Sequence, residues 1–534
     1  MHAVLQTPEL RHKIFAYSNH SHLAILARTC KTFHESALSL LWRRCENVDH
    51  VLNLLPAAIE YGLHRSCENG NTTIPSYLTP EDVIRVQHYT PFIQSLHLDF
   101  GYESTRGAPE ALAKVVIACG DQNLFPNLRE LVYLGPSTFA ACLPNITRPP
   151  LHQISMAIES MSEYDEVNDD PELSLEGGME LSILFALKAR RAHPITSLDL
   201  FLPSHCGWPI ITLLSGWDHL ESLSLATYVD ANLLSTMFSL PRLRSLKLGE
   251  DPSRTTRLES TNTLDNCLST APPTLQSLTL NSWQLSDVAD LVSGSRNLRL
   301  VKLYVTRVGE SRALGRFIQN LRKNPSEQTL RILNITRGAD PPMSRAALPS
   351  RVDDDCVALG SFQLLFDFRN LVSLILHVPG TTISLRNADL DKMAQSWPQI
   401  QRIDIQGAKK AEPDCTVVGL IPFARHCKQL ETLSISVRAW DADIPEGADV
   451  DCAQFALGKL VLYNSPICSP SEIALFLSRF FPCLHEALLS AFGNPPRGQA
   501  EQWRKVDELL PLLCQARLEG VPGGRTLQNL CGRA

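Results

Sequence analysis

The sequence lacks an excess of basic residues. Its 534 residues include 49 Lys and Arg against 56 Asp and Glu, which gives a formal net charge of −7 and a pI near 6.2. No run of Lys and Arg occurs, so the chain lacks the basic surface typical of a nucleic-acid-binding protein. It also lacks the uninterrupted run of roughly 18 or more apolar residues that a transmembrane helix requires. We therefore expect neither nucleic acid nor a membrane as a partner.

Cysteine patterns typical of metal sites or disulfide frameworks are missing too. The fifteen cysteines are scattered, with no Cys-x-x-Cys pair and no histidine at ligand spacing. The N-terminus has no charged region followed by an apolar region, as a secretory signal would. The sequence thus predicts reduced core thiols, no metal or other cofactor, and a cytoplasmic or nuclear location.

Catalytic motifs are likewise absent. The chain contains no G-x-S-x-G, no H-E-x-x-H, no G-x-x-x-x-G-K-[ST] and no G-x-G-x-x-G after a predicted strand. Its sixteen histidines have no orienting partner that the sequence implies. We expect a protein that is not an enzyme. A hydrolase whose residues converge only in the fold remains a weaker alternative.

What the chain does contain begins with three predicted helices in its first 42 residues. Residues 7–9, Thr-Pro-Glu, combine an N-cap, a proline at the first helical position and a carboxylate near the positive end of the helix dipole. Leu10, Ile14 and Tyr17 then follow at i, i+4 and i+7, which makes one apolar stripe. Similar stripes come next, at Leu23, Leu26, Ala27 and Cys30, and at Leu38, Leu41 and Trp42. Since about 40 residues cannot bury three stripes alone, we expect another surface to cover part of them.

The order and spacing of these residues resemble the F-box of fungal F-box proteins. The resemblance rests on Pro8-Glu9-Leu10, Ile14-Phe15, Leu23-x-x-Leu26-Ala27, Cys30-Lys31-x-Phe33 and Leu41-Trp42. It implies that residues 1–46 bind a Skp-type adaptor, which joins a cullin and RING ubiquitin ligase. Carried over by residue, the implied adaptor contacts are Leu5, Pro8, Glu9, Ile14, Leu23, Leu26, Ala27, Cys30, Phe33, Leu41 and Trp42.

Some positions depart from the family pattern. His12 and Lys13 stand where the family often has apolar residues, and the turn at Asn19-His20 lacks its usual aspartate. The alternative interpretation of this segment is a plain helical cap on the domain that follows.

That domain is organised by a recurring pattern, L-x-x-L-x-L, with other apolar residues sometimes substituting. From Ile195 onward the copies begin 23 to 41 residues apart, mostly near the period of leucine-rich repeats. In this pattern three apolar residues point inward from a short strand, and the return segment supplies a helix. Apolar faces predict such helices at 233–238, 285–292, 314–321 and 473–480. The expected fold class is α/β: an N-terminal three-helix module followed by a leucine-rich-repeat horseshoe solenoid, with parallel strands inside and helices outside.

The predicted domain organisation has four parts. Residues 1–46 form the F-box-like module, 47–90 a helical linker that ends in a helix near 80–88, 91–490 the solenoid, and 491–534 a C-terminal cap. Insertions interrupt the solenoid near 159–180, 251–274 and 337–361. The first insertion is acidic and is interpreted as a solvated loop, with capture of a basic partner as the alternative. Pro511 is expected to end or kink the last helix.

Strand positions that alternate with the inward apolar residues should face the concave surface. Aromatic and charged side chains there are typical anchors of a protein interface. The candidate contacts with a target protein are Asp199, Phe201, Lys247, Lys302, Tyr304, His377, Arg402, Asp404 and Tyr463.

For a solenoid with this N-terminal module, the resemblance to F-box proteins implies the substrate-recognition subunit of a Skp-cullin-F-box type ubiquitin ligase. The Skp-type adaptor and a target protein would be its partners, and proximity alone would promote ubiquitin transfer to the target. The alternative is a non-catalytic leucine-rich-repeat scaffold or inhibitor protein with a helical N-terminal cap.

Overall fold

The chain divides into two compact units, Met1–Tyr228 and Val229–Ala534. The computed structural model describes residues 3–55, 78–100, 108–119, 123–135, 143–146, 151–158, 184–185, 188, 194–201, 207–226, 229–249, 274–281, 283, 285–294, 299–306, 311–336, 362–378, 383–407, 413–440, 452–463, 465–484, 486–488 and 499–519.

The first unit opens with a small helical bundle, the N-terminal module. The predicted helices are present as α2 (Pro8–Phe15), α3 (His20–Thr29) and α4 (Lys31–Leu41), preceded by a short α1 (Ala3–Gln6). The Asn19 side chain accepts a hydrogen bond from the backbone N–H of His22 and so caps α3. The module has a core of its own, made of Phe15, Leu23, Ala27, Ala37 and Leu38.

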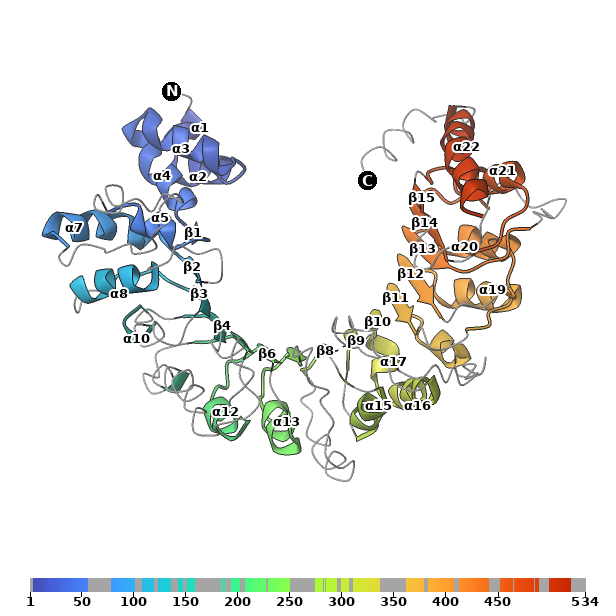
Figure 1. The fold of residues 1–534 in the computed structure, drawn as a ribbon, viewed down its shortest axis with the longest axis horizontal. Helices are drawn as coiled ribbons and strands as arrows, with labels where there is room; N and C mark the ends of the chain where they lie inside the picture. Colours follow the sequence, from blue (N-terminus) through green and yellow to red (C-terminus); the bar gives the residue numbers. More distant parts are fainter. Residues whose placement is uncertain are drawn as a thin grey trace, which may run out of the picture. The chain divides into compact units, whose positions relative to one another are not determined.

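The rest of the first unit alternates strands with helices. Its strands run parallel and pair in chain order, and the longer helices lie on one side of them (Figure 1). The elements are β1 (Arg44–Cys45), α5 (Asp49–Leu52), α7 (Pro80–Tyr89), η1 (Thr90–Phe92), β2 (Ser95–Asp99), α8 (Ala108–Ala118), β3 (Glu130–Gly135), α10 (Leu143–Ile146), β4 (Gln153–Ile158), β5 (Ser197–Phe201), α12 (Gly207–Leu214) and β6 (Ser222–Ala226).

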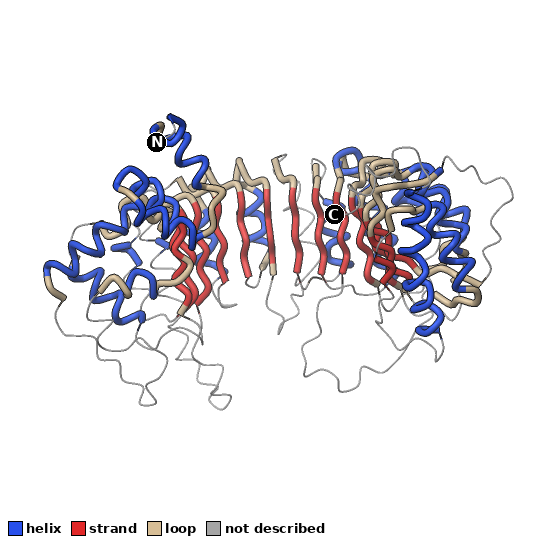
Figure 2. Tube along the Cα trace, turned by 90° about the horizontal axis from the view of Figure 1, so that it is seen from above, coloured by secondary structure: helices blue, strands red, loops and turns tan. Residues whose placement is uncertain are grey.

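The second unit continues the same alternation to a C-terminal helix, α22 (Gln499–Glu519). Figure 2 shows its strands standing side by side. The other elements are α13 (Ala231–Phe238), β7 (Ser245–Leu248), β8 (Ser277–Asn281), α15 (Leu285–Gly294), β9 (Lys302–Thr306), α16 (Ser311–Arg322), α17 (Ser326–Thr329), β10 (Ile332–Thr336), η7 (Leu364–Asp367), β11 (Ser373–His377), α19 (Asn387–Ser396), β12 (Arg402–Gln406), η8 (Val417–Leu420), α20 (Ile421–His426), β13 (Thr432–Ile435), β14 (Lys459–Leu462), α21 (Pro470–Phe480) and β15 (Glu486–Leu488).

The repeat pattern sets both the strand register and the core. Leu303 of β9 pairs with Leu333 of β10, which pairs with Leu374 of β11, and all three side chains are fully buried. The residues between the leucines point to the opposite side of the sheet, which we call the open face. The expected return helices at 233–238, 285–292, 314–321 and 473–480 are present as α13, α15, α16 and α21. The chain is therefore an α/β solenoid of the leucine-rich-repeat type, as predicted.

A regular hydrogen-bond arrangement joins successive repeats beside the strands. One backbone carbonyl accepts from two consecutive N–H groups of the next repeat. The Arg43 carbonyl, for example, accepts from Gln94 and Ser95 at 2.9 and 3.0 Å. The Arg331 carbonyl accepts in the same way from Val372 and Ser373. These bonds satisfy backbone groups just before the strands begin.

Two boundaries differ from the sequence-based expectation. β1 lies inside the predicted module of residues 1–46, yet it pairs with β2 of the repeats. Pro511 was expected to end or kink the last helix, but α22 continues through it to Glu519. Trp503 helps to fix this helix by donating from Nε1 to the Ser465 carbonyl at 2.9 Å. The helix predicted near 80–88 is present as α7. Thr79 and Asp82 form a capping box at its start, in which each side chain accepts a hydrogen bond from the backbone N–H of the other residue.

The cysteines agree with the prediction at most described positions. Eight are free, and burial raises the pKa of the Cys415 and Cys427 thiols to about 12. Cys483 is disulfide-bonded, so the prediction of reduced thiols is wrong there. The predicted insertions at 159–180 and 337–361 lie outside the described residues, as do residues 251–273 of the insertion at 251–274. Across the described helices, none is long and apolar enough to cross a membrane.

Candidate functional site

The N-terminal module exposes apolar side chains although its own core is filled. Leu10, Ile14 and Tyr17 form a stripe along and just after α2, which we call the α2 stripe; they are 43%, 45% and 94% exposed. The other side of α2 faces the core through Arg11 and Phe15. Twelve large apolar side chains are exposed among the described residues, and five of them fall within residues 4–25. This concentration makes the module the strongest candidate for a docking surface.

The predicted adaptor contacts separate by burial into two groups. Leu23 and Ala27 are only 4% and 7% exposed and belong to the module's core. Their assignment as contact residues is therefore corrected: they stabilise the bundle from within. The others retain exposure, complete or partial: Leu5, Pro8, Glu9, Ile14, Leu26, Cys30, Phe33, Leu41 and Trp42.

Two of the partly exposed aromatic residues also have packing roles. Phe33 meets Phe15 edge to face, with ring centroids 5.2 Å apart. The ring of Trp42 lies 5.1 Å from that of Tyr89 on α7. Trp42 therefore packs the module against the repeat part of the first unit. Leu10 and Tyr17 were not carried over from the family pattern, although their i, i+4, i+7 spacing with Ile14 was visible in the sequence.

A buried arginine ties the helices of the module together. Arg11 is 7% exposed; its Nε donates to Ser36 Oγ at 2.8 Å and its Nη1 to the Leu5 carbonyl at 3.2 Å. These bonds connect α1, α2 and α4. Because Arg11 sits on the helix that carries the α2 stripe, it helps to hold that stripe in place.

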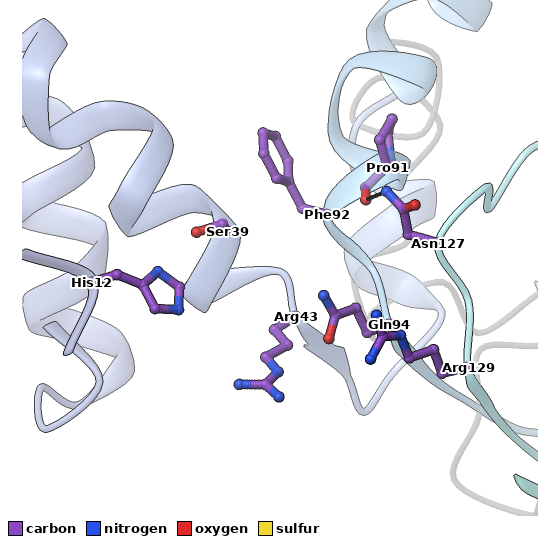
Figure 3. A pocket seen from close by; sticks show the side chains of 8 residues that line it. All are labelled: His12, Ser39, Arg43, Pro91, Phe92, Gln94, Asn127 and Arg129. Atoms are coloured by element: carbon purple, nitrogen blue, oxygen red, sulfur yellow. Dashed lines mark hydrogen bonds between the residues drawn. The ribbon is translucent and has the colours of Figure 1, made fainter. Parts of the chain in front are cut away.

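A pocket of ≈ 450 Å³ lies where the module meets the first repeats of the same unit (Figure 3). Asn127 donates from Nδ2 to the Pro91 carbonyl at 2.7 Å at its rim. None of the described residues that line it is acidic. Its lining residues are His12, Ser39, Arg43, Pro91, Phe92, Gln94, Asn127 and Arg129. The sequence does not indicate this pocket, because its residues come from separate segments that only the fold brings together.

On the open face of the second unit, four predicted target contacts form one cluster, the Asp404 cluster. Asp404 Oδ1 accepts from the Tyr463 hydroxyl at 2.9 Å, and His377 Nε2 lies 3.0 Å from the same oxygen without well-aligned hydrogen-bond geometry. Arg402 Nη2 is 3.6 Å from Oδ2. Asp404 is 5% and Tyr463 7% exposed, so their assignment as direct target contacts is corrected: both are buried and support the cluster from within. The Arg402 side chain is 51% exposed.

The charges of the cluster favour an ionised Asp404. Burial acts to raise the pKa of this carboxyl, but His377, Tyr463 and Arg402 together hold the pKa below its ordinary value. Burial and the Asp404 carboxylate raise the pKa of Tyr463, so its hydroxyl stays protonated and donates. The cluster is thus a fixed polar group with an exposed guanidinium at its edge.

The remaining predicted target contacts lie on the open face but not in this cluster. Asp199 is exposed and accepts from Ser155 Oγ at 3.1 Å, and Phe201 beside it is 43% exposed. Lys302 is exposed, and Lys247 and Tyr304 are half-buried. In the part of the chain that the structure describes, no three His, Cys, Asp or Glu side chains are placed to hold a metal ion.

Comparisons with known proteins give likeness in fold only. No protein-family model and no curated protein matches the chain. Among solved structures, one in the complex of Rad7 and Elc1 from yeast is 15% identical over 57% of this chain and 81% of that one, with a TM-score of 0.30. The leucine-rich repeat-containing protein LegL7 from Legionella pneumophila is 13% identical over 61% and 94%, with a TM-score of 0.26. A chain of the Toll–Spatzle complex from Drosophila is 12% identical over 69% and 44%, with a TM-score of 0.35.

These similarities add nothing to the fold that the structure itself defines. The protein is a repeat solenoid of the leucine-rich-repeat type with an N-terminal helical module, and repeat proteins of this kind present extended surfaces for protein interaction.

Proposed function

We propose that the protein is the substrate-recognition subunit of a Skp-cullin-F-box type ubiquitin ligase. Its N-terminal module would bind a Skp-type adaptor, and the open face of its repeats would bind a target protein. The observation that carries the proposal is the α2 stripe: Leu10, Ile14 and Tyr17 stay exposed on a bundle whose interior is already packed. An amphipathic helix with such a stripe fits an apolar groove on a partner.

The likeness of the module to an F-box indicates which partner fits the stripe. The exposed members of the family pattern, Pro8, Glu9 and Ile14, lie on α2 beside Leu10. The buried members, Leu23 and Ala27, form the core that sets the helix positions. The exposed residues of the family pattern are thus available to a partner, and its buried residues hold the helices of the module in place.

The Asp404 cluster is the best-defined candidate for contact with the target. Arg is enriched among residues that dominate interface energies, and the exposed Arg402 guanidinium lies 3.6 Å from the buried Asp404 carboxylate. Tyr463 is buried and supports this carboxylate from within. The protein would do no chemistry itself. It would raise the local concentration of a target lysine near the ubiquitin carrier. In this proposal it acts in the cytoplasm or nucleus.

A second function, a non-catalytic scaffold with a helical cap, is favoured by one observation. β1 follows α4 directly and pairs with β2, and Trp42 packs on Tyr89. The module therefore covers the end of the first repeats, as a cap would. The residues of the α2 stripe are not among those that make these contacts, so capping leaves the stripe available to an adaptor.

Co-purification with a Skp-type adaptor tests the proposal. Ile14→Asp should abolish co-purification, because it places a charge in the centre of the stripe. Ile117→Asp on α8 is the matched control, since Ile117 is also exposed, at 69%, but lies outside the module. Leu26 is unsuitable for this test because it packs against the module's core. Adaptor binding that survives Ile14→Asp in folded protein would exclude the α2 stripe as the adaptor surface and leave the scaffold function.

A further inference from the structure

The pocket between the module and the first repeats collects cationic side chains without counter-charges. Arg43 and Arg129 both line it, and neither forms an ion pair with a carboxylate of the described residues. Arg44, one residue further along, differs: its Nε lies 3.5 Å from Glu46 Oε1. Two guanidinium groups beside one cavity repel each other unless an anion lies between them. The arrangement therefore favours a negatively charged occupant.

The remaining lining residues narrow the chemistry of that occupant. His12, Gln94 and Asn127 line the cavity, where Figure 3 shows their side chains. Each has a polar group that can donate a hydrogen bond to an oxygen atom of a ligand. Phe92 and Pro91 add an apolar wall. A volume of ≈ 450 Å³ exceeds that of a phosphate ion and lies in the usual range for small-molecule sites.

We propose that this pocket binds a small phosphorylated molecule of sugar-phosphate size. Arg43 and Arg129 hold its phosphate group, because planar guanidinium groups bind phosphate oxygens through paired, charge-assisted hydrogen bonds. The amides of Gln94 and Asn127 face its hydroxyl groups, and Phe92 packs against its carbon skeleton. The site is separate from the α2 stripe and does not depend on adaptor binding.

The origin of the lining gives the ligand a structural effect. His12 and Ser39 belong to helices of the module, whereas Gln94 and Arg129 directly precede β2 and β3. A bound molecule contacts both parts of the first unit at once. It therefore stabilises the folded arrangement of module and repeats, and the melting temperature rises with ligand concentration.

The experiment measures binding to the full-length protein by calorimetry and by thermal shift. The probes are inorganic phosphate, ribose 5-phosphate and, as the phosphate-free control, ribose, all at constant ionic strength. We expect ribose 5-phosphate to bind more tightly than inorganic phosphate and ribose not to bind. Arg43→Gln and Arg129→Gln should each weaken binding about tenfold, the usual effect of losing a charge-assisted hydrogen bond. Arg44→Gln should leave it unchanged.

These variants separate loss of binding from loss of folding. Arg43, Arg44 and Arg129 are all exposed, so substitution to Gln leaves the core intact. The proposal is overturned if neither phosphate probe binds saturably, or if both Arg→Gln variants bind as the unmodified protein does. A phosphoserine peptide that binds more tightly than ribose 5-phosphate would overturn the assignment to a free small molecule. None of these outcomes bears on adaptor binding, which has its own variants.

Discussion

Truncating the α2 stripe should weaken adaptor binding without weakening the fold. Leu10 and Ile14 are 43% and 45% exposed, so nearly half of each side chain is available to a partner. Complete burial of a Leu or Ile side chain contributes about 1.5–3 kcal/mol, so covering the exposed part contributes about 1 kcal/mol for each residue. The double variant Leu10→Ala/Ile14→Ala should therefore lose about 2 kcal/mol of binding free energy, roughly a thirtyfold rise in Kd.

Leu38→Ala provides the opposite pattern. Leu38 is 5% exposed and lies in the module's core, so its truncation should lower the free energy of unfolding by about 2–5 kcal/mol. The stripe variant should unfold within about 1 kcal/mol of the unmodified protein, because alanine favours helix and its removed atoms were partly hydrated. Ile117→Ala controls for loss of an exposed apolar group elsewhere.

The assay combines calorimetric titration with a purified Skp-type adaptor and urea denaturation of the same preparations. The reasoning is refuted if the stripe variant binds within about twofold of the unmodified protein, well short of the change expected from the area covered. It is also refuted if the variant unfolds as readily as Leu38→Ala, since the stripe would then be part of the core.

Three further predictions concern single positions. Gly249→Ala should lower the free energy of unfolding, measured by urea denaturation, by at least about 3 kcal/mol, because φ is 75° and a Cβ would lie 2.2 Å from the Asn281 carbonyl oxygen. Gly216→Ala should lower it by only about 1 kcal/mol, because φ is 88° but the space around a Cβ is open. Asp404→Asn should make stability less dependent on acidic pH. Because the pKa of Asp404 is lower in the folded than in the unfolded state, its carboxylate stabilises the fold above the unfolded pKa of about 4, and this stabilisation is lost as the pH falls below that value. The melting temperature, measured from pH 6 to 2, should therefore fall less steeply in the variant. Arg11→Met should cost about 2 kcal/mol in chemical denaturation by removing the bonds to Ser36 and to the α1 carbonyl, and a loss below about 0.5 kcal/mol would contradict the role of Arg11 in holding α1.

Much of the fold could be predicted because the repeat pattern encodes register directly. Once Leu303, Leu333 and Leu374 are recognised as equivalent, their parallel pairing follows from the need to bury them side by side. The return helices follow from their apolar periodicity. The first strand could not be found this way, since Arg44 and Cys45 carry no L-x-x-L-x-L pattern and pair only because β2 offers a free edge.

The candidate sites were less predictable, for two physical reasons. An apolar stripe does not reveal which of its sides is hidden, so Leu23 was assigned to a partner although it fills the core. Convergence across strands is also invisible in a linear chain. Asp404 and Tyr463 were each expected to be exposed on the open face, but both are buried because the Tyr463 hydroxyl packs against the Asp404 carboxylate and donates to it.

The pairing of β1 with β2 has a mechanical consequence. Residues 46–94 separate these strands in sequence, but the orientation of the module is transmitted through Arg44, Cys45 and the Arg43 carbonyl, a short bridge of direct backbone bonds. The docking helix α2 is therefore tied to the first repeats by this backbone pairing and by the packing of Trp42 on Tyr89. The pairing of the two strands, and not the number of residues between them, thus fixes the orientation of the docking helix.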